Sequence, residues 1–340
     1  MDVPDYDLPQ GAIAQVPATR RDAARLLVAL DETLHHRRVA DLPGLLGPGD
    51  LLVVNTSRVV PARLALHKDS GGAAEVLLLE PVPGQPGRFQ ALVRPGRRLP
   101  PGTVLYSGGQ AVVEVGERLA DGAREVSSLV DDLSAFGALA LPPYIQHPLE
   151  DPERYQTVYA QRPGSVAAPT AGLHLTETVL ARCRRRGVEV ATLDLAVGLG
   201  TFRPIKAARV EEHAMHSERY SIAPSTWQAC QAARRVVAVG TTTLRALESA
   251  AASGILEGRT ELFIRPGYRF RAVDVLLTNF HQPRSTLLVL LEAFAGPRWR
   301  DLYAVALGEG YRFLSFGDAM IVGRHAPPTG ISQADRRGPG

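Results

Sequence analysis

The sequence predicts a mixed α/β protein that carries a small β-rich insertion. At about 150 residues per domain, its 340 residues suggest two domains, or one large domain with an insertion. Between residues 63 and about 141, short β-like runs alternate with glycine- and proline-rich turns, which is typical of a small sandwich or barrel. Downstream, apolar runs alternate with amphipathic stretches, which is typical of an α/β domain.

The individual elements follow from local patterns along the chain. Upstream of the insertion, residues 20–30 have helical spacing and residues 51–55 form a buried-strand run. The β-like runs of the insertion are residues 74–80, 88–94, 103–106 and 111–115. A helix is expected between Thr176, which can cap its start, and Gly187, which can end it.

Three apolar strands in the downstream half end in small or polar residues. They are residues 188–197, 236–239 and 273–277, and helices are expected after the second and the third. Ligands of α/β proteins gather at the carboxyl ends of such strands. The sequence therefore predicts the functional site at these strand ends.

Composition excludes several classes of protein. The hydrophobic fraction of 45% is too high for a disordered chain, and the longest apolar run, residues 287–291, is far shorter than the roughly 18 residues of a membrane span. Cys183 and Cys230 are too few for a disulfide framework or a cysteine-rich metal site. Without a visible secretory signal, we expect a cytoplasmic protein that does not contact membranes.

The positive charge is almost entirely arginine. Lysine and arginine number 38 against 35 acidic residues, a formal net charge of +3, and Lys68 and Lys206 are the only lysines. Guanidinium groups suit phosphate and RNA. The same composition is also typical of a GC-rich genome, and the arginine clusters can equally be solvated helix faces.

The first chemistry-bearing segment, residues 164–176, is rich in small residues and contains His174. Small residues allow a backbone to approach a ligand closely. His174 stands beside the expected helix start, where it can transfer protons or serve as a structural hydrogen-bonding group.

The second segment contains His213 and His216, which are expected to share a helix face three residues apart. With a carboxylate they could hold a metal, but the HExxH pattern is absent and no further ligand is evident. We favour hydrogen bonding or substrate contact over metal binding.

The third segment begins with Gly240 and three threonines at the expected start of a helix. Free N–H groups, hydroxyls and the positive helix end predict an anion seat, with Arg245 as a clamp. The structural alternative is an N-cap followed by an Arg245–Glu248 pair. Residues 278–281 add a polar cluster at the end of another strand.

Taken in order, these segments resemble one enzyme family. No dinucleotide, phosphate-loop or GxSxG motif is present. The blocks that carry the resemblance are residues 6–9, 53–55, 61–64, 154–160, 168–174, 198–202, 212–218, 240–243, 276–281 and 311–320. Together they resemble the S-adenosylmethionine:tRNA ribosyltransferase-isomerases of queuosine synthesis.

The resemblance implies a fold and a reaction. The fold is a large, barrel-like α/β domain of residues 1–63 and 141–325, with an inserted β-barrel of residues 64–140 and a flexible tail of residues 326–340. In the reaction, the ribosyl part of S-adenosylmethionine is transferred to 7-aminomethyl-7-deazaguanine in a tRNA anticodon loop. An epoxycyclopentane forms, and adenine and methionine leave. We expect a monomer in which S-adenosylmethionine is a co-substrate and no metal or other cofactor takes part.

The resemblance also assigns residues. His174 and His281 are the candidates for proton transfer. The expected substrate-binding residues are Arg58, Tyr155, Thr170, Gly172, Gly198, Gly200, Thr201, His213, His216, Thr241, Thr242, Arg245, Asn279 and Asp318.

Four positions depart from the family pattern, and two of them remove polar groups. Thr56 replaces Asp or Asn, and Ala196 replaces His, whereas Leu175 and Gln282 replace Phe and Leu. An altered acceptor, such as a free nucleobase or amine, is therefore an alternative. A non-catalytic RNA-binding protein is a second alternative, which the cluster of histidines and the anion seat disfavour.

Overall fold

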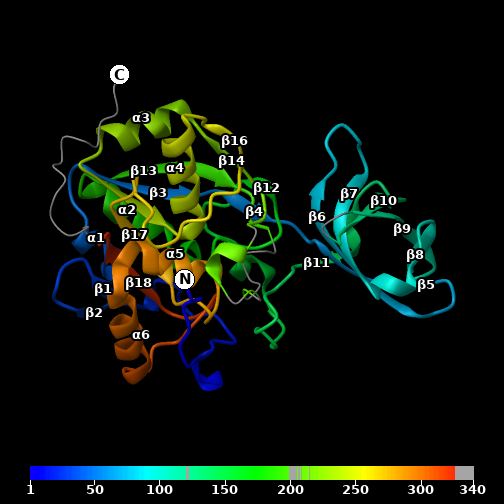
Figure 1. Cartoon of the computed structure of the whole chain (residues 1–340), viewed down its shortest axis with the longest axis horizontal. Coiled ribbons are helices and arrows are strands. Elements are labelled where there is room, and N and C mark those ends of the chain that lie inside the picture. Colours follow the sequence, from blue (N-terminus) through cyan, green and yellow to red (C-terminus); the bar gives the residue numbers. More distant parts are fainter. Residues whose placement is uncertain (120–121, 199–204, 206, 208, 214, 326–340) are drawn as a thin grey trace. The chain divides into compact units, whose positions relative to one another are not determined.

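The computed structural model describes residues 1–119, 122–198, 205, 207, 209–213 and 215–325 (Figure 1). Its internal contacts divide the chain into two compact units. The large unit comprises Met1–Ser57, Pro143–Arg162 and Ala168–Gly340, and the small unit comprises Arg58–Pro142 and Pro163–Ala167. The expected tail, residues 326–340, lies outside the described residues.

The small unit is a closed antiparallel barrel. Its strands are β5 (Arg63–Lys68), β6 (Ala73–Pro81), β7 (Arg88–Arg94), β8 (Thr103–Ser107), β9 (Gln110–Arg118) and β10 (Arg124–Ser128). They pair in the order β5-β6-β7-β10-β9-β8, and a further pairing between β5 and β8 closes the ring. Leu64, Val76, Val113 and Val126 are fully buried, as inward positions of a small barrel are. The sequence left a sandwich and a barrel open, and the structure is a barrel.

The large unit is built on a mixed sheet in the order β16-β14-β13-β3-β15-β17-β18-β1-β2. Its strands are β1 (Arg25–Ala29), β2 (His35–Arg38), β3 (Asp50–Asn55), β13 (Glu189–Leu195), β14 (Glu218–Ile222), β15 (Arg235–Val239), β16 (Glu257–Thr260), β17 (Val275–Asn279) and β18 (Ala319–Gly323). The four strands β13, β3, β15 and β17 are parallel neighbours, so their carboxyl ends meet at one edge. The α/β class is confirmed, and this sheet is open, with β16 and β2 at its edges.

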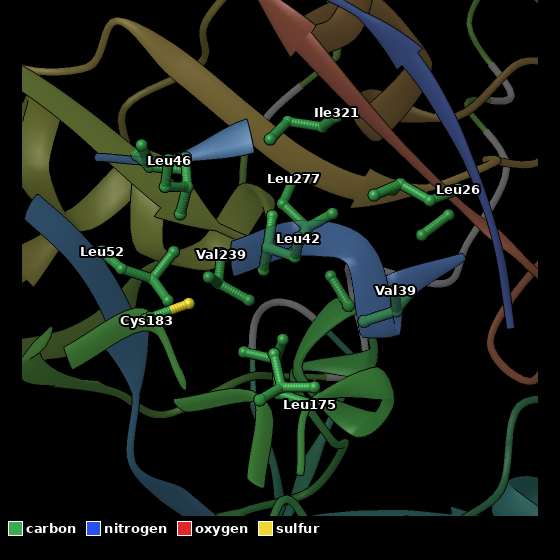
Figure 2. Packing of buried hydrophobic residues seen from close by; sticks show 14 of the residues in the cluster. Leu26, Val39, Leu42, Leu46, Leu52, Leu175, Cys183, Val239, Leu277 and Ile321 are labelled. Atoms are coloured by element: carbon green, nitrogen blue, oxygen red, sulfur yellow. The ribbon is translucent and has the colours of Figure 1, made fainter. Parts of the chain in front are cut away.

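Helices cover the central strands on both faces. They are α1 (Leu42–Leu45), α2 (Glu177–Arg185), α3 (Pro224–Ala232), α4 (Thr241–Ser253), α5 (Thr286–Ala295) and α6 (Trp299–Gly308). Figure 2 shows the core between the strands and the α1–α2 side, with Leu26, Val39, Leu42, Leu46, Leu52, Leu175, Cys183, Val239, Leu277 and Ile321 labelled. Alternate residues of the same strands, such as Val53, Ala238 and Leu276, are equally buried, as parallel strands require.

Local signals placed the helix starts correctly. The Thr176 hydroxyl accepts a hydrogen bond from the Val179 N–H (3.2 Å), and the Ser285 hydroxyl does the same for Leu288 (3.2 Å). Gly187 follows α2 with a φ of 77°, the left-handed conformation that ends helices. Among the described residues, no helix combines the length and the apolar character that crossing a membrane requires.

The helix predicted for residues 20–30 is wrong. Arg21–Ala23 forms a short 3₁₀ turn, and the remainder is strand β1 between β18 and β2. Leu26, Leu27 and Ala29 are fully buried. A strand buried on both faces has a continuous apolar run, and helical periodicity does not distinguish it from a buried helix.

Candidate active site

The carboxyl ends of β15 and β17 bring the predicted polar clusters together. β17 ends at Asn279, followed by Phe280 and His281, and β15 is followed by Gly240 and the start of α4. The 3₁₀ helix Thr170–His174 packs against β17. Residues from three distant sequence blocks therefore meet at the edge of the sheet where the sequence analysis expected the site.

The Asn279 side chain links the end of β17 to the 3₁₀ helix Thr170–His174. Its amide nitrogen lies 3.0 Å from Nε2 of His174, and its amide oxygen accepts a hydrogen bond from the Thr170 hydroxyl at 2.9 Å. With the amide in this orientation, Nε2 of His174 is the acceptor and carries no proton. Burial, together with the nearby charges of Arg312 and Arg21, lowers the pKa of His174 to about 4. His174 is therefore neutral and anchors Asn279.

Both backbone polar groups of His281 are hydrogen-bonded to tyrosine hydroxyls. Its N–H donates to the Tyr303 hydroxyl (2.8 Å), and its carbonyl oxygen accepts a hydrogen bond from the Tyr6 hydroxyl (2.5 Å). The ring Nε2 lies 2.9 Å from the Thr278 hydroxyl. Burial lowers the pKa of His281 to about 3, so the imidazole is neutral at physiological pH. Motif analysis missed Tyr303 as a support for His281, and the contact from Tyr6 crosses 275 residues of chain.

Three adjoining hollows surround these groups. The central hollow has a volume of about 340 Å³, and its walls include Thr170, Gly240, Thr242, Thr278, Asn279 and His281. The β17 hollow, about 320 Å³, shares Thr170, Asn279 and His281 with it and adds Tyr144, Gln282 and Ser315. The α4 hollow, about 530 Å³, shares Thr241, Thr242 and Leu287 with the central hollow. His281 thus faces two hollows, whereas His174 lines a separate one beside Arg21 and Arg154.

The start of α4 keeps hydrogen-bonding groups without partners. Gly240 precedes the helix with a φ of 88°, a conformation that favours glycine. The Thr243 hydroxyl donates to the carbonyl of Val239 at 2.7 Å. By contrast, the buried Thr242 hydroxyl has no partner among the described residues. This unpartnered group lies between the central and the α4 hollows.

Arg245 is bound within the protein, and neither role that the sequence suggested describes its contacts. It pairs with Glu218, and its remaining bonds go to the carbonyl oxygens of His216 (3.0 Å), Thr260 (2.8 Å) and Leu262 (3.0 Å). Burial lowers the pKa of Arg245, against the opposing effect of Glu218. Arg245 thus ties α4 to β14 and β16.

The expected Arg245–Glu248 pair is not formed. Glu248 instead accepts the backbone N–H groups of Arg271 (2.9 Å), Ala272 (3.0 Å) and Val273 (3.0 Å). Burial raises the pKa of this carboxyl, and the three N–H donors act in the opposite direction. Glu248 therefore anchors the loop before β17.

His213 and His216 do not share a helix face. A short 3₁₀ turn ends at Glu212, and the described residues between this turn and β14, which begins at Glu218, are not helical. Both histidines nevertheless line the α4 hollow, where the His213 ring meets Phe263 edge-on at 5.7 Å. Within the described part of the chain, no group of three or more His, Cys, Asp or Glu side chains is arranged to hold a metal.

Several expected binding residues have internal partners. The Asp318 carboxylate accepts the backbone N–H groups of Arg25 and Arg312, both at 2.8 Å. A Cβ at Gly172 would lie 2.2 Å from the Tyr159 hydroxyl, so close packing requires glycine there. Tyr155 is fully buried, with its ring edge-on to Phe316.

The remaining predicted positions are divided between the two units. The Gly198 N–H donates to Glu218 at 2.9 Å, beside the α4 hollow. Arg58 belongs to strand β4 (Ser57–Val59) and to the small unit. Gly200 and Thr201 lie outside the described residues.

Thr56 and Ala196, the two departures from the family pattern that remove polar groups, directly follow the carboxyl ends of β3 and β13. The Thr56 hydroxyl donates to the carbonyl of Leu193 at 3.1 Å, so it is used within the sheet. The Ala196 N–H donates to the Arg219 carbonyl at 3.0 Å, next to Val197, which lines the central hollow.

Comparisons with known proteins agree on one family. A family model described as "Queuosine biosynthesis protein" matches residues 2–322. Proteins named S-adenosylmethionine:tRNA ribosyltransferase-isomerase from Moorella thermoacetica and Thermus thermophilus are 49% and 50% identical, each over 94% of this chain and 98% of the relative. A crystal structure of S-adenosylmethionine tRNA ribosyltransferase from Thermotoga maritima is 34% identical, with a TM-score of 0.53 over 94% of this chain and 99% of that one.

Proposed function

The chain belongs to the family of queuosine biosynthesis proteins, and we propose that it is an S-adenosylmethionine:tRNA ribosyltransferase-isomerase. In this reaction the ribosyl part of S-adenosylmethionine is transferred to a 7-aminomethyl-7-deazaguanine base in tRNA and isomerised to an epoxycyclopentane. Adenine and methionine are released. The observation that carries the proposal at the level of the site is the neutral His281 ring on the walls of two adjoining hollows.

His281 is the proton-transfer residue in this proposal. The sulfonium of the donor makes its C5′ hydrogens acidic, so a single well-placed base can start the reaction. The lowered pKa keeps one ring nitrogen of His281 without a proton, so the neutral imidazole can accept one. A proton taken from C5′ forms a short-lived imidazolium that can pass it on to the departing adenine. Thr278, 2.9 Å from the ring, orients it.

His174 has a positioning role in this proposal. It lines a different hollow and reaches the site through Asn279. The Asn279 amide nitrogen is used by His174 and by the carbonyl oxygens of Leu314 and Asp318, so the amide oxygen, which accepts from Thr170 and has a second lone pair, is the group left for a ligand. A fixed amide suits a sugar hydroxyl or a base edge.

The β17 hollow is the proposed site of the acceptor base. Its walls carry the Tyr144 and Ser315 hydroxyls, which lie 2.7 Å apart, together with Gln282. Such groups read the edge of a base that has been taken out of its stack. We propose that a monomer carries out the reaction in the cytoplasm, where its tRNA acceptor is expected.

An adenine-release assay tests the function. The protein is incubated with S-adenosylmethionine and one of three acceptors: tRNA carrying the deazaguanine, unmodified tRNA, or the free base. Adenine is then followed by chromatography. We expect release with the modified tRNA alone, and no change after dialysis against a chelator, because the sulfonium already supplies the acidity. Turnover on the free base but not on tRNA would refute the tRNA acceptor, and metal-dependent turnover would refute the metal-free mechanism.

A further inference from the structure

The α4 hollow combines three kinds of wall. One is the start of α4, where the N–H groups of Thr241 and Thr242 have no acceptor among the described residues. The second is the carboxylate of Glu218. The third is apolar and consists of Met215, Leu262, Phe263, Ile264, Leu287 and Leu290.

The helix start is suited to an anion. The first N–H groups of an α-helix are unpaired and carry the positive end of its dipole. A second polar group lies at the same helix start: Thr242 is only 8% exposed, and its hydroxyl has no partner among the described residues. A buried hydroxyl without a partner is unfavourable, and native proteins rarely keep one without a reason. A bound carboxylate would accept from the hydroxyl and the two N–H groups together.

The other charges on the hollow do not oppose this assignment. The positive charge of Arg245 is balanced by Glu218, with which it pairs. Besides Arg245, the Glu218 carboxylate accepts the Gly198 N–H, so this carboxylate is engaged within the protein. Partial burial, together with the nearby His216, lowers the pKa of the half-buried His213, which favours its neutral form.

We propose that the α4 hollow binds the α-amino-acid end of the donor, with the carboxylate at Thr241 and Thr242 and the methylene chain that leads to the sulfonium along the apolar wall. The proposal rests on the ribosyl transfer inferred above and deepens it. Thr242 belongs to both the α4 and the central hollows, and His281 lines the central one. The chain of the donor can therefore extend from the helix start toward the proton-transfer group.

The test compares two thioether ligands that differ in the amino-acid end. S-Adenosylhomocysteine has that end, and 5′-methylthioadenosine lacks it. Thr242→Val removes the hydroxyl and keeps the shape, and Thr243→Val is the matched control in the same turn, because its hydroxyl is already bonded to Val239. Calorimetry gives the Kd of each ligand for each variant, and thermal melting gives the Tm.

We expect Thr242→Val to weaken S-adenosylhomocysteine binding by about ten- to a hundredfold, as the loss of a hydrogen bond to a charged group does. Its affinity for 5′-methylthioadenosine and its Tm should not fall, since the hydroxyl has no protein partner. Thr243→Val should bind both ligands like the wild type but melt earlier. Thr242→Ser should restore S-adenosylhomocysteine binding, and Thr242→Ala replaces the valine variant if that variant does not fold.

Two outcomes would overturn the proposal. One is wild-type S-adenosylhomocysteine affinity in the valine and alanine variants, and the other is an equal loss for both ligands. Neither result depends on tRNA. A binding result as expected, combined with no adenine release on modified tRNA, would reject the proposed function and leave the amino-acid site standing.

Discussion

Two parts of helix α4 differ in whether their polar side chains have partners within the protein. Within the helix, Arg245 and Glu248 are saturated by Glu218, by carbonyl oxygens and by backbone N–H groups. At its first turn, the Thr242 hydroxyl has no partner among the described residues. An unpaired buried charge costs several kcal/mol, whereas an unpaired hydroxyl costs about 1–3 kcal/mol. Only the neutral groups can therefore be kept open for a ligand.

The same contrast separates His281 from Arg245, although both were candidate site residues. His281 is neutral and lines two hollows, and its backbone is held by tyrosines. Arg245 is charged, and its N–H groups donate hydrogen bonds to Glu218 and to backbone carbonyl oxygens of the protein. In this site the charged side chain is engaged in supporting the fold, and the neutral polar groups are the ones that remain for the proposed chemistry.

The largest expected effect is on turnover at His281. His281→Gln removes the proton acceptor and should reduce adenine release by about 10²- to 10⁴-fold, with little change in donor affinity. The matched control is His174→Gln, which acts only through Asn279 and should reduce turnover by about tenfold. Initial rates of adenine release and calorimetric Kd values for the donor measure the two effects. A severe loss in His174→Gln with a mild one in His281→Gln would reverse the two roles.

The next effect concerns stability at Arg245. Arg245→Ala leaves the buried Glu218 without its counter-charge and should lower the free energy of unfolding by about 3–5 kcal/mol. Replacing both residues by apolar ones should recover part of that loss. Urea unfolding of the single and double variants measures it. A stable Arg245→Ala protein that fails to bind the donor would instead support the clamp that the sequence suggested.

The smallest effect is a dependence of stability on pH. In the folded protein the pKa values of His174 and His281 are lowered to about 4 and about 3, while the unfolded chain has the ordinary value near 6.5. The unfolded state therefore binds more protons below about pH 6.5, and stability must fall as the pH falls from there toward the folded pKa values. Each histidine should contribute about 1 kcal/mol per pH unit between about pH 6 and 5.

Unfolding free energies of the wild type and of the two glutamine variants check this effect. Each variant should show a shallower dependence on pH than the wild type. Identical slopes in all three proteins would mean that the histidines titrate normally in the folded state.

Local patterns predicted much of the fold and the position of the site. Thr176 caps the helix expected after it, Ser285 caps the helix expected after residues 273–277, and the apolar runs before Gly240 and Thr278 are strands of the central sheet. These signals act within a few residues, so they are readable in the chain itself. The helix predicted for residues 20–30 failed because the partners of β1 come from residues 35–38 and 319–323.

Sequence alone predicted which segments carry chemistry and that the site lies at the carboxyl ends of strands. It also determined the family, because the matching blocks extend along nearly the whole chain. Only the tertiary structure decided which polar groups have hydrogen-bond or ion-pair partners within the protein. Glu218 is 27 residues from Arg245, and Tyr6 is 275 residues from His281, so no local pattern could pair them. A side chain's capacity to bind a ligand is what remains after the fold has satisfied its charges and hydrogen bonds.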